Sequence, residues 1–259
     1  MERLAAIADI HGNFWALEAV LRDIGRRGIS DIVNLGDTAD ADMDPAGAIE
    51  LVMRHGITSI AGNYETFKPG QISPEQEAWL RGLPKTRDLG DVFCCHGTPT
   101  SDTTELVEEI TLDRTELAPV ELIIERLDGI RHEVILCAHK HVPRLVALPS
   151  GQIVVNPGSV GLPAYWNDEP VLHRVEAGSP HARYAILTRT PAGWAVDHVA
   201  LPYSWEQAAA AARASSRHDR AEFIETGRAE VPPREAGQSI GAEDVNVCTE
   251  SRKPKGRRR

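Results

Sequence analysis

The chain has 259 residues and a formal net charge of −10, and 42% of its residues are hydrophobic. This length suffices for one large α/β domain or two small ones with a substantial core. The acidic balance argues against a nucleic-acid-binding groove, and no apolar run reaches the length of a membrane span. The first residues enter a strand without the basic region and cleavage site of a secretion signal, so we expect a cytoplasmic protein with no membrane partner.

The C-terminal end differs in charge from the rest of the chain. Six basic and no acidic residues lie between Arg252 and Arg259, which leaves 22 basic and 38 acidic residues elsewhere, a balance of −16. The basic end could contact phosphate backbones by simple electrostatics, but a solvated tail is the simpler interpretation. We therefore do not favour nucleic acid as a partner.

Apolar runs alternate with helical patterns over the first 140 residues. This alternation predicts right-handed βαβ crossovers and a largely parallel sheet. Asn13, Asp44 and Ser73 are expected to cap three of the helices. We expect strands at 6–8, 32–35, 57–60, 91–95 and 134–138, and helices at 14–27, 45–55, 74–81 and 103–127, the last interrupted near Pro119.

The pattern changes after residue 141. Short antiparallel strands are expected at 145–148 and 153–155, a hairpin at 184–190 and 194–200, and an alanine-rich helix at 204–216. We expect one domain over residues 1–223, followed by a flexible tail over 224–259. Residues 164–177 look like an insertion that could cover the active site. Its Tyr165, Trp166 and Arg174 could stack a nucleobase and bind phosphate, although ordinary packing of Trp166 is an equally good interpretation.

Five successive strands end in side chains that can bind a metal ion. Because ligand sites gather beyond the carboxyl ends of strands in α/β sheets, we expect these side chains to converge. Carboxylate, imidazole and amide groups suit Mn, Fe or Zn, and argue against a thiolate-rich zinc site or a calcium cage. Seven ligands are too many for one ion, so they predict two sites that share Asp37, with the ions roughly 3.5–4 Å apart. The seven are Asp9, His11, Asp37, Asn63, His96, His139 and His141.

The order of these residues resembles the calcineurin-like metallophosphoesterase superfamily, whose pattern is D-x-H, G-D, G-N-H-[DE], H and G-H-x-H. The match spans about Met1 to Gly161, and the loop 156–161 is similar to that of the small bacterial phosphodiesterases and dinucleoside polyphosphate phosphatases. The resemblance implies an α/β fold, the four-layer α/β/β/α sandwich. It also implies that one metal is held by Asp9, His11, Asp37 and His141 and the other by Asp37, Asn63, His96 and His139.

The resemblance further implies a hydrolase in which two divalent ions activate a bridging water to attack phosphorus. Mn²⁺ is the first expectation, with Fe, Zn, Ni or Co as alternatives, and the substrate is expected to be a phosphodiester, a nucleotide or a dinucleoside polyphosphate. Asn13 and Asn63 are expected to help orient the phosphate.

Two positions depart from the family pattern. Tyr64 stands where the family has the histidine often assigned as the acid for the leaving group, and Ala138 replaces the glycine before the last histidine pair. A phenol with a pKa near 10 is a poorer proton donor than an imidazolium. We therefore expect Tyr64 to shift the preference toward substrates with acidic leaving groups.

Other functions stay open at this point. A phosphomonoesterase or protein phosphatase uses the same chemistry, and the superfamily fold also serves as a metal-free scaffold, although all seven ligands are intact here. Nucleic-acid processing with the help of the basic tail is a further alternative. Asp40, Asp42 and Asp44 alternate as in a calcium loop, but Pro45 stands where glycine is required, so we interpret them as loop and helix cap.

Overall fold

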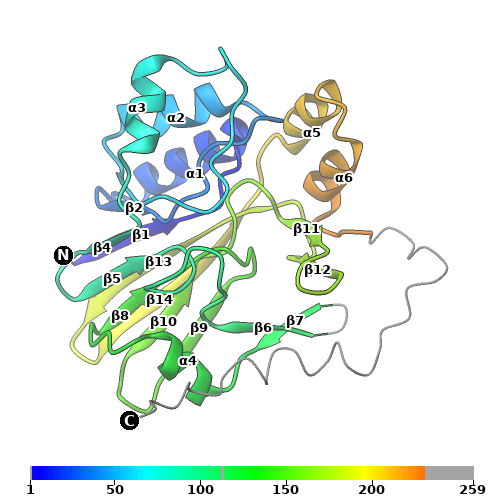
Figure 1. The fold of residues 1–259 in the computed structure, drawn as a ribbon. Helices are drawn as coiled ribbons and strands as arrows, with labels where there is room; N and C mark the ends of the chain where they lie inside the picture. Colours follow the sequence, from blue (N-terminus) through cyan, green and yellow to red (C-terminus); the bar gives the residue numbers. More distant parts are fainter. Residues whose placement is uncertain (1, 112–113, 231–259) are drawn as a thin grey trace, which may run out of the picture.

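The computed structural model describes residues 2–111 and 114–230, and its centre is a pair of five-stranded sheets packed face to face (Figure 1). The first sheet has the order β14-β13-β1-β2-β3, and the second has the order β4-β5-β8-β10-β9. The strands of the first sheet are β1 (Arg3–Ile7), β2 (Ile32–Asn34), β3 (Thr58–Ser59), β13 (Ala182–Thr190) and β14 (Gly193–Leu201). Those of the second are β4 (Thr86–Asp88), β5 (Val92–Cys95), β8 (Val134–Leu136), β9 (Arg144–Ala147) and β10 (Ile153–Asn156).

Each sheet contains three adjacent parallel strands with antiparallel strands beside them. β1, β2 and β3 are parallel, as are β5, β8 and β10, whereas β13, β4 and β9 pair with them in the opposite direction. The hairpin β13–β14 has the register Ala182↔Leu201 to Thr190↔Gly193. The predicted parallel sheet is therefore split into two parallel groups, whose carboxyl ends carry the predicted ligands.

Helices cover the outer face of the first sheet. They are α1 (Phe14–Arg26), α2 (Pro45–Arg54) and α3 (Pro74–Arg81). Asn13, Asp44 and Ser73 accept hydrogen bonds from the first turns of these helices, and Ser73 forms the complete capping box with Gln76, so the predicted caps are confirmed. The apolar face of α1, including Leu17 and Ile24, is fully buried against β1.

The core has three apolar layers, which accounts for the four-layer sandwich. One lies between the two sheets, where Leu4 and Ala6 of β1 meet Val92 and Leu136 of the second sheet. A second lies between the first sheet and α1–α2, and the third lies between the second sheet and α4 (Val120–Arg126). β1 reads as a continuous apolar run because both of its faces are buried. The predicted α/β sandwich is confirmed.

The predicted helix over 103–127 is wrong in its first half. β6 (Glu108–Thr111) and β7 (Arg114–Leu117) pair as antiparallel strands, and of the described residues in this range only Val120–Arg126 are helical. β-branched residues in this segment favour extended backbone. The Glu108 side chain is fully buried and lies 2.9 Å from the guanidinium of Arg144 on β9, a tertiary contact that the sequence does not reveal.

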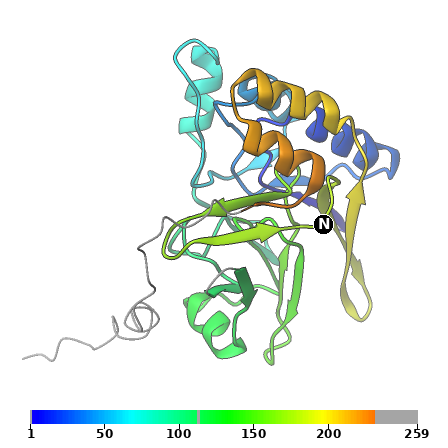
Figure 2. The same ribbon diagram turned by 90° about the vertical axis from the view of Figure 1, so that its right-hand side faces the viewer.

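The C-terminal part of the described chain forms a helical pair beside the site. α5 (Trp205–Ala214) matches the predicted alanine-rich helix, and α6 (His218–Thr226) follows it. The predicted domain edge at residue 223 falls inside α6, and the domain division itself stays a prediction, since residues 231–259 of the expected tail lie outside the described residues. Figure 2 shows α6 next to the hairpin of β11 (Ala164–Asn167) and β12 (His173–Glu176), which occupies the expected insertion.

Candidate metal centre

Four of the seven predicted ligands lie on left-handed backbone. Asp9, His11, Asp37 and His139 have φ values of 52°, 48°, 54° and 69°. Such conformations cost of order 1–3 kcal/mol per residue and cluster at functional sites. Two hydrogen bonds hold the first two loops together, from the N–H of Asp9 to the carbonyl of Gly36 (3.1 Å) and from the N–H of His11 to that of Asp37 (2.9 Å). This strain is offset by the interlocked loops, and it supports a functional role for the site.

Two glycines allow the loops after β2 and β3 to touch. A Cβ on Gly36 would lie 2.4 Å from the nitrogen of Gly62, and one on Gly62 would lie 2.0 Å from Oδ1 of Asp37. The Glu65 carboxylate links the loops by accepting the N–H groups of Thr38 (3.0 Å) and Gly62 (3.4 Å). Burial, reinforced by the nearby Asp37 carboxylate, raises the pKa of Glu65 to about 7. Glu65 had no predicted role, although its position at the end of the Gly62-Asn63-Tyr64-Glu65 motif could have indicated one.

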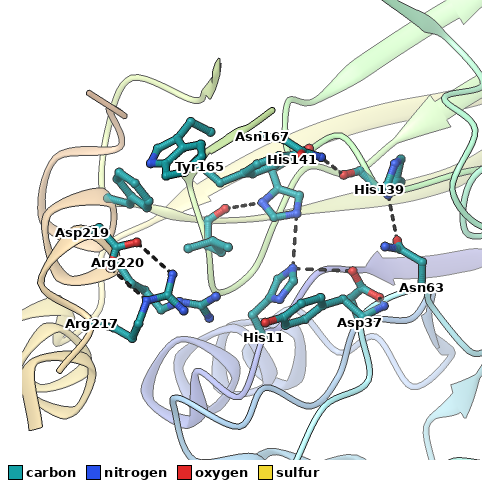
Figure 3. Close-up of a pocket in the computed structure, with 14 residues that line it drawn as sticks. His11, Asp37, Asn63, His139, His141, Tyr165, Asn167, Arg217, Asp219 and Arg220 are labelled. Carbon is teal, nitrogen blue, oxygen red and sulfur yellow. Dashed lines mark hydrogen bonds and ion pairs between the residues drawn. The ribbon is translucent and has the colours of Figure 1, made fainter. Parts of the chain in front are cut away.

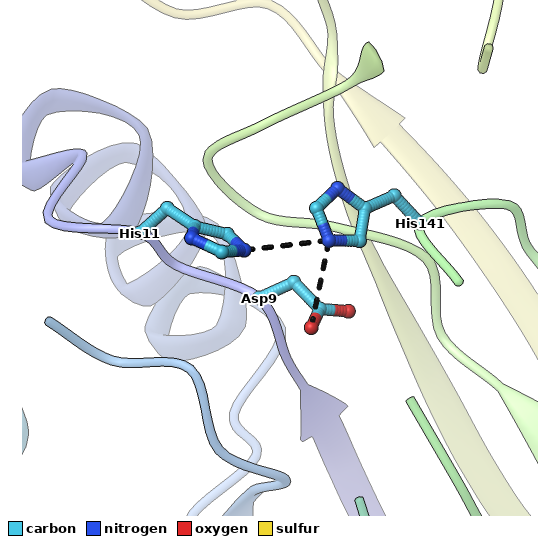
Figure 4. A group of neighbouring side chains, drawn as sticks. All are labelled: Asp9, His11 and His141. Atoms are coloured by element: carbon cyan, nitrogen blue, oxygen red, sulfur yellow. Dashed lines mark hydrogen bonds and ion pairs between the residues drawn. The ribbon is translucent and has the colours of Figure 1, made fainter. Parts of the chain in front are cut away.

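Asp9, His11 and His141 form a first cluster of metal-ligand type (Figure 4). The Nε2 atoms of the two histidines lie 3.3 Å apart, and Nε2 of His141 lies 3.7 Å from Oδ1 of Asp9. All three side chains are buried. Both carboxylate oxygens of Asp9 are buried without a hydrogen-bond partner. Buried polar atoms are normally satisfied, so this carboxylate is suited to bind a cation.

A second cluster adjoins the first. Asp9, Asp37 and His96 each offer an atom within 4.8 Å of the others, and Nε2 of His96 lies 3.5 Å from Oδ2 of Asp37. Oδ1 of Asn63 lies 2.9 Å from Nε2 of His96 and 2.8 Å from Nδ1 of His139. The structure therefore brings all seven predicted side chains together. Asp9 belongs to both clusters, whereas the prediction shares Asp37 between two ions, and that sharing stays a prediction.

The imidazoles are oriented by main-chain carbonyls. Nδ1 of His96 lies 2.8 Å from the carbonyl oxygen of Leu35, and Nδ1 of His141 lies 2.6 Å from that of Leu162. An Nδ1–H donated to each carbonyl directs Nε2 of the same ring into the site. This arrangement is typical of histidines that bind a metal through Nε2.

Burial opposes the charged form of His96, but the Asp37 and Asp9 carboxylates outweigh burial and raise the pKa of its imidazole to about 10. At Asp9, His139 and His141 the dominant influence is burial. It raises the pKa of Asp9 to about 7, where His96 opposes the shift and the Asp37 carboxylate adds to it. It lowers the pKa of His139 to about 3 and that of His141 well below its usual value, with neighbouring imidazoles adding to both shifts. Neutral imidazole is the form that binds metals, and a nearby cation favours an ionised carboxylate. The donor set therefore fits a divalent ion of the Mn, Fe or Zn type, whose positive charge would favour release of the His96 proton.

A pocket of about 350 Å³ opens over the predicted ligands (Figure 3). Its floor includes His11, Asp37 and Asn63, and Arg217 and Asp219 line it on the side of α6. This volume is within the range of small-molecule sites. The contribution of α6 was not predicted from the sequence, because the helix begins beyond the alanine-rich segment in a stretch with many charged residues.

A chain of buried charges connects α6 to the first cluster. Arg220 forms an ion pair with Asp40, and Oδ2 of Asp40 lies 3.5 Å from Nδ1 of His11. Arg220 is 5% exposed and Asp40 is fully buried. Burial raises the pKa of Asp40, but His11 and Arg220 outweigh it and hold this pKa at about 2. Asp40, interpreted from sequence as a loop residue, is thus an ionised carboxylate in electrostatic contact with His11, a contact suited to orienting the imidazole.

The β11–β12 hairpin packs on the metal-ligand loop. The Tyr165 ring lies 4.6 Å from the His141 ring in an edge-on arrangement. Lys140, between the last two predicted ligands, lies 3.0 Å from the carboxylate of Glu105 and 3.4 Å from Nε2 of His173 on β12. The hairpin therefore supports the loop. Tyr165 and Trp166 line the pocket, whereas Arg174 is not among its described lining residues.

The remaining predicted site residues differ in their contacts. Tyr64 lines the pocket, its ring lies 5.6 Å from that of His11, and its N–H donates to Oδ1 of Asp37 (2.7 Å). Asn13 caps α1, and its amide donates to the carbonyl of Gly161 (2.9 Å) and to the Tyr203 hydroxyl (3.0 Å). These contacts give Asn13 a structural role, and its part in orienting phosphate stays a prediction.

Comparison with known proteins places this site in a family. The model of the calcineurin-like phosphoesterase superfamily domain matches residues 2–178, more than half of the chain. The chain belongs to this superfamily. The predicted resemblance is thereby confirmed, and membership of this superfamily supports the prediction of a hydrolase that acts on phosphoester bonds. Within the described residues, no helix has the length and apolar character needed to cross a membrane.

Individual relatives give less detail. An uncharacterised protein of Methanocaldococcus jannaschii is 42% identical over 62 residues, which is 24% of this chain and only about a quarter (26%) of that protein. A metallophosphoesterase structure from Sphaerobacter thermophilus is 22% identical, with a TM-score of 0.63 over 88% of this chain and 99% of its own. A hypothetical protein of Pyrococcus horikoshii is 18% identical, with a TM-score of 0.65 over 89% and 100% of the two chains. At these low sequence identities the two structures show that the fold is shared and nothing about activity.

Proposed function

We propose that the protein is a metal-dependent phosphohydrolase with a dinuclear centre held by the seven predicted ligands. The observation that carries this proposal is the convergence of carboxylate, imidazole and amide groups around the buried, unpartnered carboxylate of Asp9. Asp9, His11, Asp37 and His141 would hold one ion, and Asp37, Asn63, His96 and His139 the other. Mn²⁺ is the preferred ion, with Fe, Zn, Ni and Co as alternatives. The cytoplasmic location also stays a prediction.

The residues of the chain have distinct parts in the proposed reaction. Divalent ions, when bound, supply a water of lowered pKa and neutralise charge on the phosphate. Asp40 and the carbonyls of Leu35 and Leu162 fix the imidazoles, so that little reorganisation is needed when substrate binds. Tyr64 lines the pocket, where its phenol can hydrogen-bond a leaving oxygen but donates its proton poorly.

The test is hydrolysis of bis-p-nitrophenyl phosphate, p-nitrophenyl phosphate and diadenosine tetraphosphate with added Mn²⁺. We expect activity on at least one of these substrates in the wild type and a loss of at least about 10³-fold in Asp37→Asn, since loss of a metal ligand removes Lewis-acid catalysis. Asp197→Asn, on the exposed face of β14, makes the same chemical change away from the site and should keep full activity. A comparison of the rates on p-nitrophenyl phosphate, a monoester, and bis-p-nitrophenyl phosphate, a diester, also distinguishes a phosphomonoesterase from a phosphodiesterase. A wild type inert with every metal and substrate would favour the non-catalytic scaffold.

A further inference from the structure

The α6 side of the pocket has charged groups that are already paired with one another. Arg217 makes a two-pronged contact with Asp219, at 3.0 Å from Nε and 2.9 Å from a terminal nitrogen, and another terminal nitrogen lies 2.6 Å from Asp42. Arg220 is paired with Asp40. The ammonium of Lys68 also lies 3.3 Å from Oδ1 of Asp42. Three cationic groups thus face three carboxylates, and both arginines on this side of the pocket are already paired.

The same side of the pocket is apolar closer to the β11–β12 hairpin. Leu162 and Phe223 are buried in one small apolar cluster, and Trp166 packs against it half-buried. All three residues also line the pocket. A substrate group that extends from the metal ligands toward this cluster therefore meets an aromatic surface.

These two features bear differently on the candidate substrates. A polyphosphate chain places further charges beyond the reacting phosphate, and proteins neutralise such charges with arginine or lysine clamps. Both arginines that line the described pocket are held by carboxylates, so neither is free for this role. A phosphodiester carries a single negative charge, on the reacting phosphate itself, so it needs no such clamp. Aromatic surfaces stack flat groups of many kinds, including nucleobases.

We infer that the substrate is a singly charged phosphodiester with a flat aromatic substituent, and that nucleoside polyphosphates are selected against by the Asp42–Arg217–Asp219 group. This inference rests on the proposed function and narrows it. The aromatic substituent would lie on Trp166 and Phe223, while Asp219 and Asp42 keep Arg217 from binding a second phosphate.

The experiment compares kcat/KM for bis-p-nitrophenyl phosphate, methyl p-nitrophenyl phosphate and diadenosine tetraphosphate with Mn²⁺. The two diesters share a charge and a leaving group and differ in the second substituent. Because p-nitrophenyl also makes the phosphorus more reactive, which acts on kcat, the aromatic contact is measured by the difference in KM. We expect the bis-aryl diester to be preferred over the methyl diester by about tenfold through a lower KM, a ratio typical of one well-packed contact. Phe223→Ala should reduce this preference by most of that factor.

The charge argument is tested by a gain of activity. Asp219→Asn removes one carboxylate from Arg217, and we expect kcat/KM for diadenosine tetraphosphate to rise about tenfold relative to the bis-aryl diester, with the gain shrinking at high salt. Asp42→Asn is a second variant with the same expected direction. Glu222→Gln makes an equal charge change on the exposed face of α6 and should leave the ratio unchanged.

The outcomes separate the inference from the proposed function. Preference of the wild type for diadenosine tetraphosphate, or no change in the ratio in either carboxylate variant, would overturn the inference and leave a phosphohydrolase. Absence of activity on all three substrates with every metal would overturn the proposed function and the inference together.

Discussion

The buried pair between Arg220 and Asp40 is the contact through which α6 supports the proposed metal centre. Replacing Arg220 by Met keeps most of its apolar stem but leaves the fully buried Asp40 carboxylate without its cation. Removal of one partner of a buried pair costs about 3–5 kcal/mol. Asp40 keeps the N–H of Asp42 at 3.0 Å and His11 at 3.5 Å, so we expect Arg220→Met to lose about 3 kcal/mol of unfolding free energy, the lower end of that range.

Urea denaturation of wild type, Arg220→Met, Asp40→Asn and the double variant measures this contribution. Neutralising Asp40 removes the stranded charge, so the double variant should recover part of the loss and give a coupling energy of about 2 kcal/mol. The matched control is Arg213→Met, which breaks the exposed pair between Arg213 and Glu225 at the α5–α6 contact. We expect that control to cost at most about 1 kcal/mol.

Metal binding gives the second measurement on these variants. Because Asp40 orients His11, Asp40→Asn and Arg220→Met should weaken Mn²⁺ binding by about 10–100-fold in calorimetric titrations. The Arg213→Met control should bind Mn²⁺ like the wild type. Arg220→Met with a loss below about 1 kcal/mol and unchanged Mn²⁺ affinity would refute the reasoning that connects α6 to the metal centre.

Three further predictions concern single positions. Tyr64→His should raise the turnover of substrates with poor leaving groups by on the order of 10²-fold and change the turnover of activated aryl esters much less. Equal effects on both kinds of substrate would show that Tyr64 takes no part in departure of the leaving group. Gly161→Ala should reduce the unfolding free energy, measured with heat or urea, by about 3 kcal/mol, because a Cβ would lie 1.8 Å from the carbonyl oxygen of Ile10. A reduction below about 1 kcal/mol would show that the loop can move to accept the Cβ. Burial raises the pKa of Asp23, but the hydrogen bond from Tyr184 and neighbouring arginines outweigh it and leave the pKa below its usual value. The stability that this hydrogen bond contributes is therefore present at pH 7 and lost as the pH falls through the lowered pKa of Asp23. Tyr184→Phe should thus reduce the unfolding free energy by about 1.5–3 kcal/mol at pH 7 and by progressively less below about pH 4. A loss that does not depend on pH would contradict this assignment.

The seven candidate ligands could be predicted because they obey a local rule. Each follows an apolar strand, and the carboxyl ends of parallel strands meet at one edge of a sheet. The split into two sheets did not disturb this, since the sheets stack with their carboxyl ends on the same side. The strain at Asp9 and Asp37 could not be predicted, because residues other than glycine rarely adopt positive φ without tertiary support.

The residues that support the ligands depend on contacts distant in the sequence. Asp40 and Arg220 are 180 positions apart, and each alone reads as a charged surface residue. The same applies to Glu108, whose burial against Arg144 favours a hairpin where the spacing of apolar residues predicts a helix. α6 was missed because Arg220, on its buried face, interrupts the apolar pattern by which an amphipathic helix is recognised.

The number of ions bound per chain tests the central claim most directly. Metal-free protein would be titrated calorimetrically with Mn²⁺, and the bound metal would be counted by elemental analysis in the wild type, Asp37→Asn and the Asp197→Asn control. The account predicts two ions per chain in the wild type and the control, and loss of at least one ion together with loss of phosphoester hydrolysis in Asp37→Asn. Full hydrolytic activity with one ion or none, or two tightly bound ions in Asp37→Asn, would contradict it.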